Sequence, residues 1–124
     1  MTIEEQLVAM MLGDAGLAEI VGDRVYPLVV PQETPLPAVT YQEVDTRALA
    51  SAGGDDGRRE SQFAVSVWGE SYPAVKGARG ALLGLFHGYR GGMVERIEAR
   101  SRDEYVPEVE WFREVVELGV LWRE

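Results

Sequence analysis

The sequence predicts one α+β domain: a mostly antiparallel sheet of about four to five strands with two helices packed on one face. Two observations predict this fold. In several runs apolar residues alternate with polar ones, which is the period of a half-buried strand. In two other segments apolar residues recur every three to four positions, which is the period of an amphipathic helix. The length of 124 residues is that of one domain, spanning 1–124.

The first helix is expected at residues 2–12. Thr2 followed three positions later by Glu5 fits a capping box, in which each side chain accepts a bond from the other residue's backbone amide. Gly13 is a plausible end for this helix. Asp14 can cap a further short turn that runs through Ile20.

The main helix is expected at residues 72–87, after Ser71 as its N-cap. Its apolar stripe comprises Val75, Ala78, Leu82, Leu85 and Phe86. A second, narrow face consists of small residues: Gly77, Ala81, Gly84 and Gly88. This smooth face allows a close approach by another backbone, either the sheet beneath or a neighbouring subunit, and we favour the sheet.

The strands are expected at four clear positions, namely 38–44, 60–68, 93–100 and 110–122. The run 60–68 is the strongest, with Phe63, Val65 and Val67 on one face. In 110–122, Glu114 interrupts an otherwise apolar row. The segment 25–30 is also extended, but it contains Pro27, which cannot donate to a ladder and belongs at a sheet edge.

Two segments lack any apolar period. Residues 45–59 combine glycines with charges of both signs, which predicts a mobile loop. A loop of that length is often functional, although a plain disordered hairpin tip is an equal alternative. Residues 101–109, around Pro107, are expected to form a second loop.

The charge balance argues against sequence-specific DNA binding. The formal net charge is −9, and a duplex-binding domain normally carries a basic face. The chain has no run apolar enough to cross a membrane, and the acidic N-terminal segment is unlike a secretory signal. We therefore expect no membrane partner and no specific binding of nucleic acid.

No constellation of residues points to catalysis, a metal or a cofactor. The chain has no cysteine and a single histidine, His87, so thiolate and His-pair metal sites are excluded. Phosphate-loop and nucleophile-elbow patterns are missing as well. We expect His87 to have a structural role at the end of the main helix, with a general base as the weaker alternative. The sequence predicts no enzyme, no catalytic residue, no metal and no cofactor.

Several segments, taken in order, resemble the tail-completion or tail-terminator (head–tail joining) proteins of long-tailed bacteriophages. The segments that carry the resemblance are 21–27 (VGDRVYP), 35–42 (PLPAVTYQ), 63–69 (FAVSVWG), 81–84 (ALLG), 111–113 (WFR) and 118–122 (LGVLW). Tyr72 follows the third segment closely. The succession of segments, more than any single motif, carries the resemblance, and 45–59 and 101–109 stand outside it.

The resemblance implies a structural assembly protein in the virion tail, put together in the host cytoplasm. Such proteins form a ring, usually of six copies, at the head-proximal end of the tail tube. They end tube polymerisation and contact the head-completion or neck proteins. The implied partners are therefore further copies of the chain, the tube protein and a neck protein, with DNA passing through the channel without specific binding.

A ring requires two different patches that meet, and unpaired strand edges are one way to supply them. We expect such edges on strand 93–100 and at the end of strand 110–122, and we expect 45–59 to dock on tube or neck by ordering on contact. The candidate interface residues are Arg47, Asp55, Asp56, Arg58, Arg59, Arg96, Glu98 and Arg100. The alternatives are another minor tail or head–tail connector protein, or a small soluble ligand-binding or regulatory α+β domain with an enclosed pocket.

Overall fold

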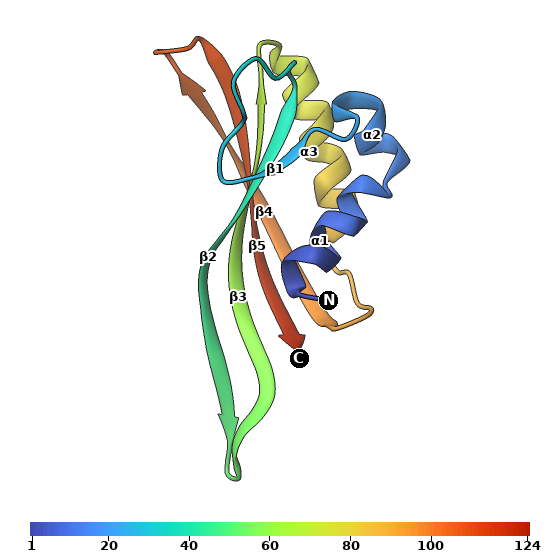
Figure 1. Ribbon diagram of the computed structural model, residues 1–124, viewed down its shortest axis with the longest axis vertical. Helices are drawn as coiled ribbons and strands as arrows, with labels where there is room; N and C mark the ends of the chain where they lie inside the picture. Colours follow the sequence, from blue (N-terminus) through green and yellow to red (C-terminus); the bar gives the residue numbers. More distant parts are fainter.

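Five strands form one twisted sheet, and three helices cover one of its two faces (Figure 1). The computed structural model describes residues 1–124. The helices are α1 (Ile3–Leu12), α2 (Ala15–Val21) and α3 (Tyr72–Phe86). The strands are β1 (Val25–Pro27), β2 (Ala38–Ser51), β3 (Gly54–Gly69), β4 (Val94–Val106) and β5 (Trp111–Arg123). The predicted α+β class is confirmed, and the short turn predicted after Asp14 is the third helix, α2.

The sheet has the strand order β1-β2-β3-β5-β4. Only the β1–β2 pair is parallel, and the other three pairs are antiparallel. Pro27 lies in β1 at the outer edge, as its missing amide donor predicts. β5 lies between β3 and β4, so it has no free edge. The expectation of an unpaired edge at the end of strand 110–122 is therefore wrong.

The core lies between the helices and the covered face of β3, β5 and β4. Phe63, Val65 and Val67 of β3 are all buried there, as their alternation predicts. From α3 the fully buried side chains are Val75, Ala78, Leu82 and Phe86. Full burial of one such side chain contributes about 1.5–3 kcal/mol, so this layer holds α3 on the sheet.

The small-residue face of α3 does not lie on the sheet, contrary to our expectation. A Cβ atom added at Gly77 would meet Ile20 of α2 at 3.4 Å, and one added at Gly84 would meet nothing within 4 Å. The wider apolar stripe of α3 covers the sheet instead, because it buries more apolar surface. The glycines therefore lie beside α2 and towards solvent.

Residues 45–59 form a β-hairpin, and the prediction of a mobile loop is wrong. β2 continues to Ser51 and β3 starts at Gly54, with Ala52 and Gly53 at the turn. We call residues 43–60 the arm; Figure 1 shows it projecting well beyond the helices. Most arm side chains are exposed or half-exposed on both faces, so the arm needs no alternation of apolar residues. Its backbone is held by cross-strand pairing, which leaves no periodic signal in the sequence.

The second predicted loop, 101–109, is mostly strand. β4 continues to Val106, and only residues 107–110 form the turn into β5. The exposed half of β4 carries charged side chains on one face and few apolar ones on the other. A polar edge strand of this kind resembles a loop in its composition.

Gln6 joins α1 to the turn between α3 and β4. Its Nε2 donates to the carbonyl of Gly91 at 3.0 Å, and its Oε1 accepts from the amide of Met93 at 3.1 Å. Gly92 has a φ of 55°, and a Cβ atom there would lie 2.7 Å from Gln6 Oε1. Only a glycine therefore fits this turn beneath the buried Gln6 side chain.

A buried carboxylate lies under α3 without a hydrogen-bond partner. Glu114 of β5 is fully buried, and neither of its carboxylate oxygens has a hydrogen-bond partner. Arg79 NH1 lies 3.6 Å from Glu114 Oε1, and Lys76 Nζ lies 3.9 Å from the same atom. Burial, and then the neighbouring Asp103, raise the pKa of Glu114 to about 7. This is the residue at which the apolar row of 110–122 is interrupted.

Asp103 of β4 has a closer contact with Lys76 than Glu114 has. Its carboxylate accepts from Lys76 at 2.8 Å and from the Tyr72 hydroxyl at 2.5 Å. The neighbouring carboxyl group of Glu114, and then the bonds from Lys76 and Tyr72, lower the pKa of Asp103.

We expect Gln6→Ala to lower the free energy of unfolding by about 1–2 kcal/mol, because two polar groups of the turn lose their partner. Urea unfolding followed by tryptophan fluorescence measures this change. Exposed Glu19→Ala on α2 is the control and should stay within about 0.5 kcal/mol of the wild type. Equal stability of the Gln6 variant and the control would contradict the proposed clamp.

We expect Glu114→Gln to change how stability depends on pH. Between the ordinary carboxyl pKa of 4.5 and about 7, the folded chain binds a proton at Glu114 that the unfolded chain does not bind. The stability of the wild type therefore falls as pH rises through this range, by on the order of 2 kcal/mol. Glutamine cannot titrate, so the variant should lack this loss and gain on the wild type at pH 8.

Urea unfolding at pH 4.5, 6 and 8 tests the expectation for Glu114. The asparagine variant of Asp103 is unsuitable as a control, since that residue belongs to the same cluster. Exposed Glu98→Gln on β4 is the matched removal of one carboxylate. Parallel stability curves for wild type and Glu114→Gln across this range would show that the buried carboxyl does not titrate there.

Candidate assembly surfaces

The charged residues of the arm form ion pairs within the chain. Arg47 NH2 lies 2.9 Å from Glu60 Oε1 across the hairpin. Arg59 NH1 lies 2.9 Å from Asp55 Oδ1, and Arg59 NH2 lies 3.5 Å from Glu124 Oε2. The bonds from Arg59, and then the amide of Gly57, lower the pKa of Asp55. Five of the eight predicted interface residues thus lie on this arm, where the sequence places them together.

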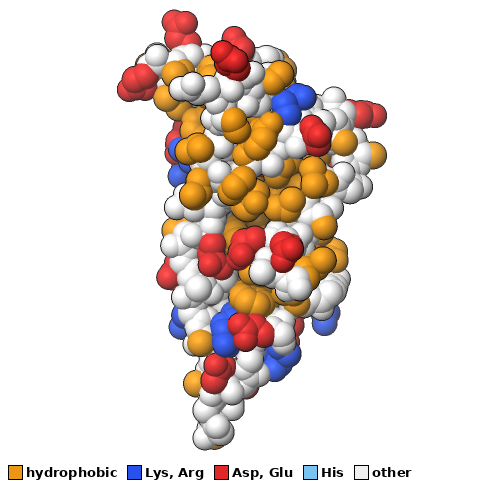
Figure 2. All heavy atoms as spheres, viewed as in Figure 1, with side chains coloured by type: hydrophobic (Ala, Val, Ile, Leu, Met, Phe, Trp, Pro, Cys, Tyr) orange, Lys and Arg blue, Asp and Glu red, His pale blue; other side chains and the backbone are white.

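Arg58 and Asp56 connect the arm to the body. Arg58 Nε donates to Glu95 Oε2 at 3.1 Å, at the start of β4. The Asp56 carboxylate accepts from the amide of Arg58 at 3.0 Å, and its carbonyl accepts from Arg123 NH1 at 2.6 Å. These contacts stiffen the base of the arm, whereas its tip, residues 51–54, carries no charge (Figure 2).

The other three predicted residues lie apart from the arm, along β4. Arg96 Nε and Glu98 Oε1 are 4.0 Å apart on the same strand. Arg100 NH2 lies 3.0 Å from Glu117 Oε2 of β5, yet the Arg100 side chain is 84% exposed. Arg102 bonds the other oxygen of Glu117. The structure therefore divides the eight residues between the arm, formed by β2 and β3, and β4 at one end of the strand order.

One free edge belongs to β2. β1 pairs with β2 only at Val39, Thr40 and Tyr41, so the rest of β2 has a partner on its β3 side alone. The carbonyl of Tyr41 and the amide of Val39 point towards the β1 side. Because strand amides alternate in direction and a bulge interrupts the register at Val44, the amides of Thr46 and Ala48 point outward. We call residues 43–51 the β2 edge.

The other free edge belongs to β4, and its first half is covered. The His87 Nδ1 accepts from the amide of Ala99 at 3.1 Å, and the amide of Gly88 donates to the carbonyl of Ile97 at 2.9 Å. His87 is also the C-cap of α3, which confirms its structural role. The expectation that strand 93–100 offers an open edge is therefore wrong for most of its length. The open part is residues 101–106, which we call the β4 edge.

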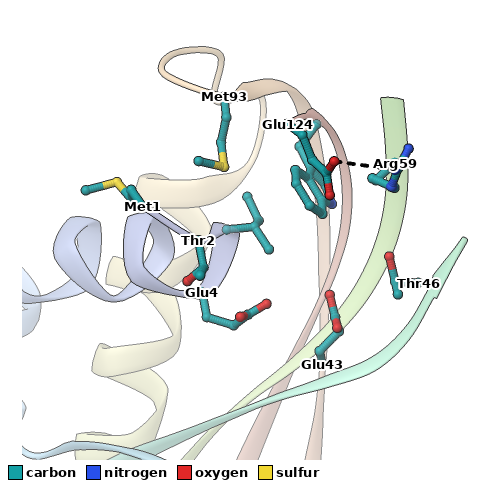
Figure 3. Close-up of a pocket in the computed structure, with 10 residues that line it drawn as sticks. Met1, Thr2, Glu4, Glu43, Thr46, Arg59, Met93 and Glu124 are labelled. Atoms are coloured by element: carbon teal, nitrogen blue, oxygen red, sulfur yellow. Dashed lines mark hydrogen bonds and ion pairs between the residues drawn. The ribbon is translucent and has the colours of Figure 1, made fainter. Parts of the chain in front are cut away.

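A half-open pocket of about 520 Å³ lies between the start of α1 and the base of the arm (Figure 3). Its apolar lining includes Ile3, Met93 and Trp122, and Glu4 and Glu43 approach it from opposite elements. Burial and then the nearby Glu43 raise the pKa of Glu4. The pocket opens to solvent beside the β2 edge and is not the enclosed cavity that a ligand-binding domain requires.

The chain has no cluster of three or more side chains that could hold a metal ion. No helix is both long enough and apolar enough to cross a membrane.

The chain shares its fold with a protein of a virion. A chain in the solved structure described as "Virion of native gene transfer agent (GTA) particle" superposes with a TM-score of 0.78 at 20% sequence identity. The match covers 94% of this chain and 90% of that chain. None of the curated proteins compared matches this chain.

The sequence match extends over almost the whole chain. Residues 5–121 match the family described as tail completion protein gp17. This match includes β1 to β4, α2, α3 and nearly all of α1 and β5, so it covers the arm and both free edges. The chain therefore belongs to the tail completion protein gp17 family, a family of structural proteins of phage tails.

Proposed function

We propose that this chain caps the head-proximal end of a phage tail tube as a ring, ends tube polymerisation and joins the tail to the neck proteins of the head. The observation that carries the proposal is that one rigid sheet ends in two free edges of different kinds. Membership of the family supports a role in the phage tail, and two unlike edges provide the two different patches that a closed ring requires.

The ring follows from the difference between the edges. A patch that meets a different patch on the next copy makes a head-to-tail contact, and such contacts close when the rotation per copy divides a full turn. Six copies are the expected number, on the resemblance to tail-terminator proteins. The net charge of −9 per chain opposes association in free solution, which favours assembly on the tube end.

The arm is the part of the chain best placed to reach another protein. It projects beyond the helices and ends in the uncharged residues 51–54 (Figure 1). Most of its charges are used within the chain, so its contact with tube or neck relies on backbone, small side chains and the exposed Arg47. Arg47, Arg58 and Arg59 remain the ion-pair donors that we propose for this contact, beginning with Arg47, whose side chain is 66% exposed.

Passage of DNA is compatible with the same charge. A ring of acidic chains repels phosphate from any part of the channel lined by carboxylates, so DNA slides through without adhering. No specific binding of DNA, no cofactor and no membrane partner belong to this proposal. Assembly takes place in the host cytoplasm, and the finished ring stays at the head end of the tail.

We expect the purified chain to bind one end of tubes assembled from the tube protein of its own phage. Negative-stain electron microscopy should show a ring on that end, and addition of the chain during polymerisation should shorten the tubes. Serum albumin at equal concentration is the control for non-specific effects. Binding along the whole tube, with no effect on length, would contradict the capping role.

We expect shortening of the arm to prevent joining of tail to head while the body stays folded. The variant replaces residues 49–58 with Asn-Gly, because Ala48 and Arg59 are paired across the hairpin and Asn-Gly makes a two-residue turn. Complementation of a phage lacking the gene, followed by electron microscopy, should show separate heads and tails. Ala52→Asn keeps the arm length and is the control.

The arm prediction is contradicted if phage carrying the shortened arm yield normal joined particles. The unfolding midpoint of the variant, measured by circular dichroism, must match that of Ala52→Asn for the comparison to report on docking.

A further inference from the structure

We infer that neighbouring copies in the ring join by strand pairing, with the β2 edge of one copy hydrogen-bonded to the β4 edge of the next. This inference rests on the proposed ring and names its contact surface. The occupant of each edge is thus a second copy of this chain, and the joined sheets form one continuous band around the ring.

The two edges are the places where backbone donors and acceptors lack partners. At the β2 edge the amides of Thr46 and Ala48 point away from β3. At the β4 edge the pairing with β5 leaves Ser101, Asp103 and Tyr105 pointing outward, by the same alternation that points Ala99 to His87. The β4 edge offers six residues, or roughly 20 Å of strand, and the nine residues of the β2 edge are long enough to pair with all of it.

Each edge strand is covered over its first part and open over its second part, and this favours pairing between the two open parts. The first part of β2 is covered by β1, and the first part of β4 is covered by His87 and the residues after it. Proteins normally protect long edges, because an unpaired edge invites another chain. Here the protection stops at Tyr41 on β2 and at Ala99 on β4, which leaves one open stretch on each side of the sheet.

Each open stretch also exposes one large apolar side chain. Val44 on the β2 edge is 60% exposed, and Tyr105 on the β4 edge is 52% exposed. Tyr105 packs against Phe112 with ring centroids 5.2 Å apart, so it forms the rim of an aromatic cluster. Val44 and Tyr105 lie on opposite faces of the sheet, so pairing of the two edges would cover each of them with side chains of the neighbouring strand and add an apolar contribution to the backbone bonds.

Charge complements the backbone at the same place. Glu43 and Asp45 on the β2 edge have no ion-pair partner within the chain, whereas Arg47 already pairs with Glu60. Next to the β4 edge, Arg100 projects its guanidinium into solvent with only Glu117 as partner. Asp45 and Arg100 lie on the same, uncovered face of the sheet, so contact between copies brings a carboxylate without an ion-pair partner towards an exposed cation, whereas pairing of two identical β2 edges would bring carboxylates together.

The absence of cysteine makes a cross-linking test clean. The test uses single-cysteine variants of the full chain, Ala48→Cys on the β2 edge and Ser101→Cys on the β4 edge, mixed and assembled on tubes, then oxidised mildly. We expect disulfide-linked dimers from the mixture and none from either variant alone. The chain carrying both substitutions should give a ladder of linked copies that ends at the full ring.

A control and a register series complete the cross-linking test. Gly80→Cys lies on the exposed side of α3, where an added Cβ meets nothing within 4 Å, and should give no dimers with Ala48→Cys. Thr46→Cys is also mixed in turn with Ser101→Cys, Asp103→Cys and Tyr105→Cys. This series detects a pairing in which the two strands are shifted along one another.

A second variant tests the backbone contribution directly. Ala48→Pro removes an amide that points outward, so it leaves the pairing of β2 with β3 intact and blocks a donor to the neighbouring copy. We expect its ring assembly on tubes to fall at least tenfold, on the order of 1.4 kcal/mol per contact, with the unfolding midpoint little changed. Ala52→Asn at the arm turn is the control.

The outcomes separate this inference from the proposed function. Rings on tubes without edge-specific cross-links, or with dimers from Ala48→Cys alone, would overturn the pairing of unlike edges and leave the capping function standing. A chain that never forms an oligomer on tubes or virions would overturn both.

Discussion

The whole molecule depends on the burial of one sheet face beneath α3. Val75, Ala78, Leu82 and Phe86 pack on the alternating apolar side chains of β3, and α1 and α2 extend this layer. Because the helices cover only part of the sheet, the strands continue beyond the core without a hydrophobic layer. The surfaces that we propose for assembly, namely the arm and both free edges, belong to these uncovered parts of the strands.

The uncovered strands are stabilised by local pairs. Arg47 with Glu60 and Arg59 with Asp55 cross the arm, and each exposed pair of this type contributes only about 0–1 kcal/mol. The backbone hydrogen bonds between β2 and β3 therefore contribute most of the stability of the extended arm. The body contains one costly feature, the fully buried Glu114, and two cations, Lys76 and Arg79, lie 3.9 Å and 3.6 Å from its carboxylate.

Most of the body could be predicted from the sequence, because burial imposes a period on it. The alternation Phe63, Val65, Val67 predicts β3, and the spacing of Val75, Ala78 and Leu82 predicts α3. Glu114 was visible as the break in an apolar row. The capping box of Thr2 and Glu5 gave the start of α1 to within one residue.

The arm and the second half of β4 could not be predicted in the same way. Both faces of residues 45–51 and 54–60 are largely exposed, so nothing forces apolar residues into register. A usable signal was still present, since Arg47 and Glu60 are opposite charges on either side of the turn at Ala52 and Gly53. Which edge of the sheet stays open is a different matter: it depends on the strand order and on whether His87 reaches Ala99, and a single sequence reveals neither.

The cover that His87 and Gly88 place over half of β4 gives any joined band a polarity. One end of a growing row of copies always presents the β2 edge, and the other end always presents the β4 edge. Copies therefore add in one orientation only. The number of copies in a closed band then follows from the right-handed twist that each sheet adds, and the bulge at Val44 contributes to that twist. In the ring that we propose, the circumference would therefore depend on the strand geometry within each subunit.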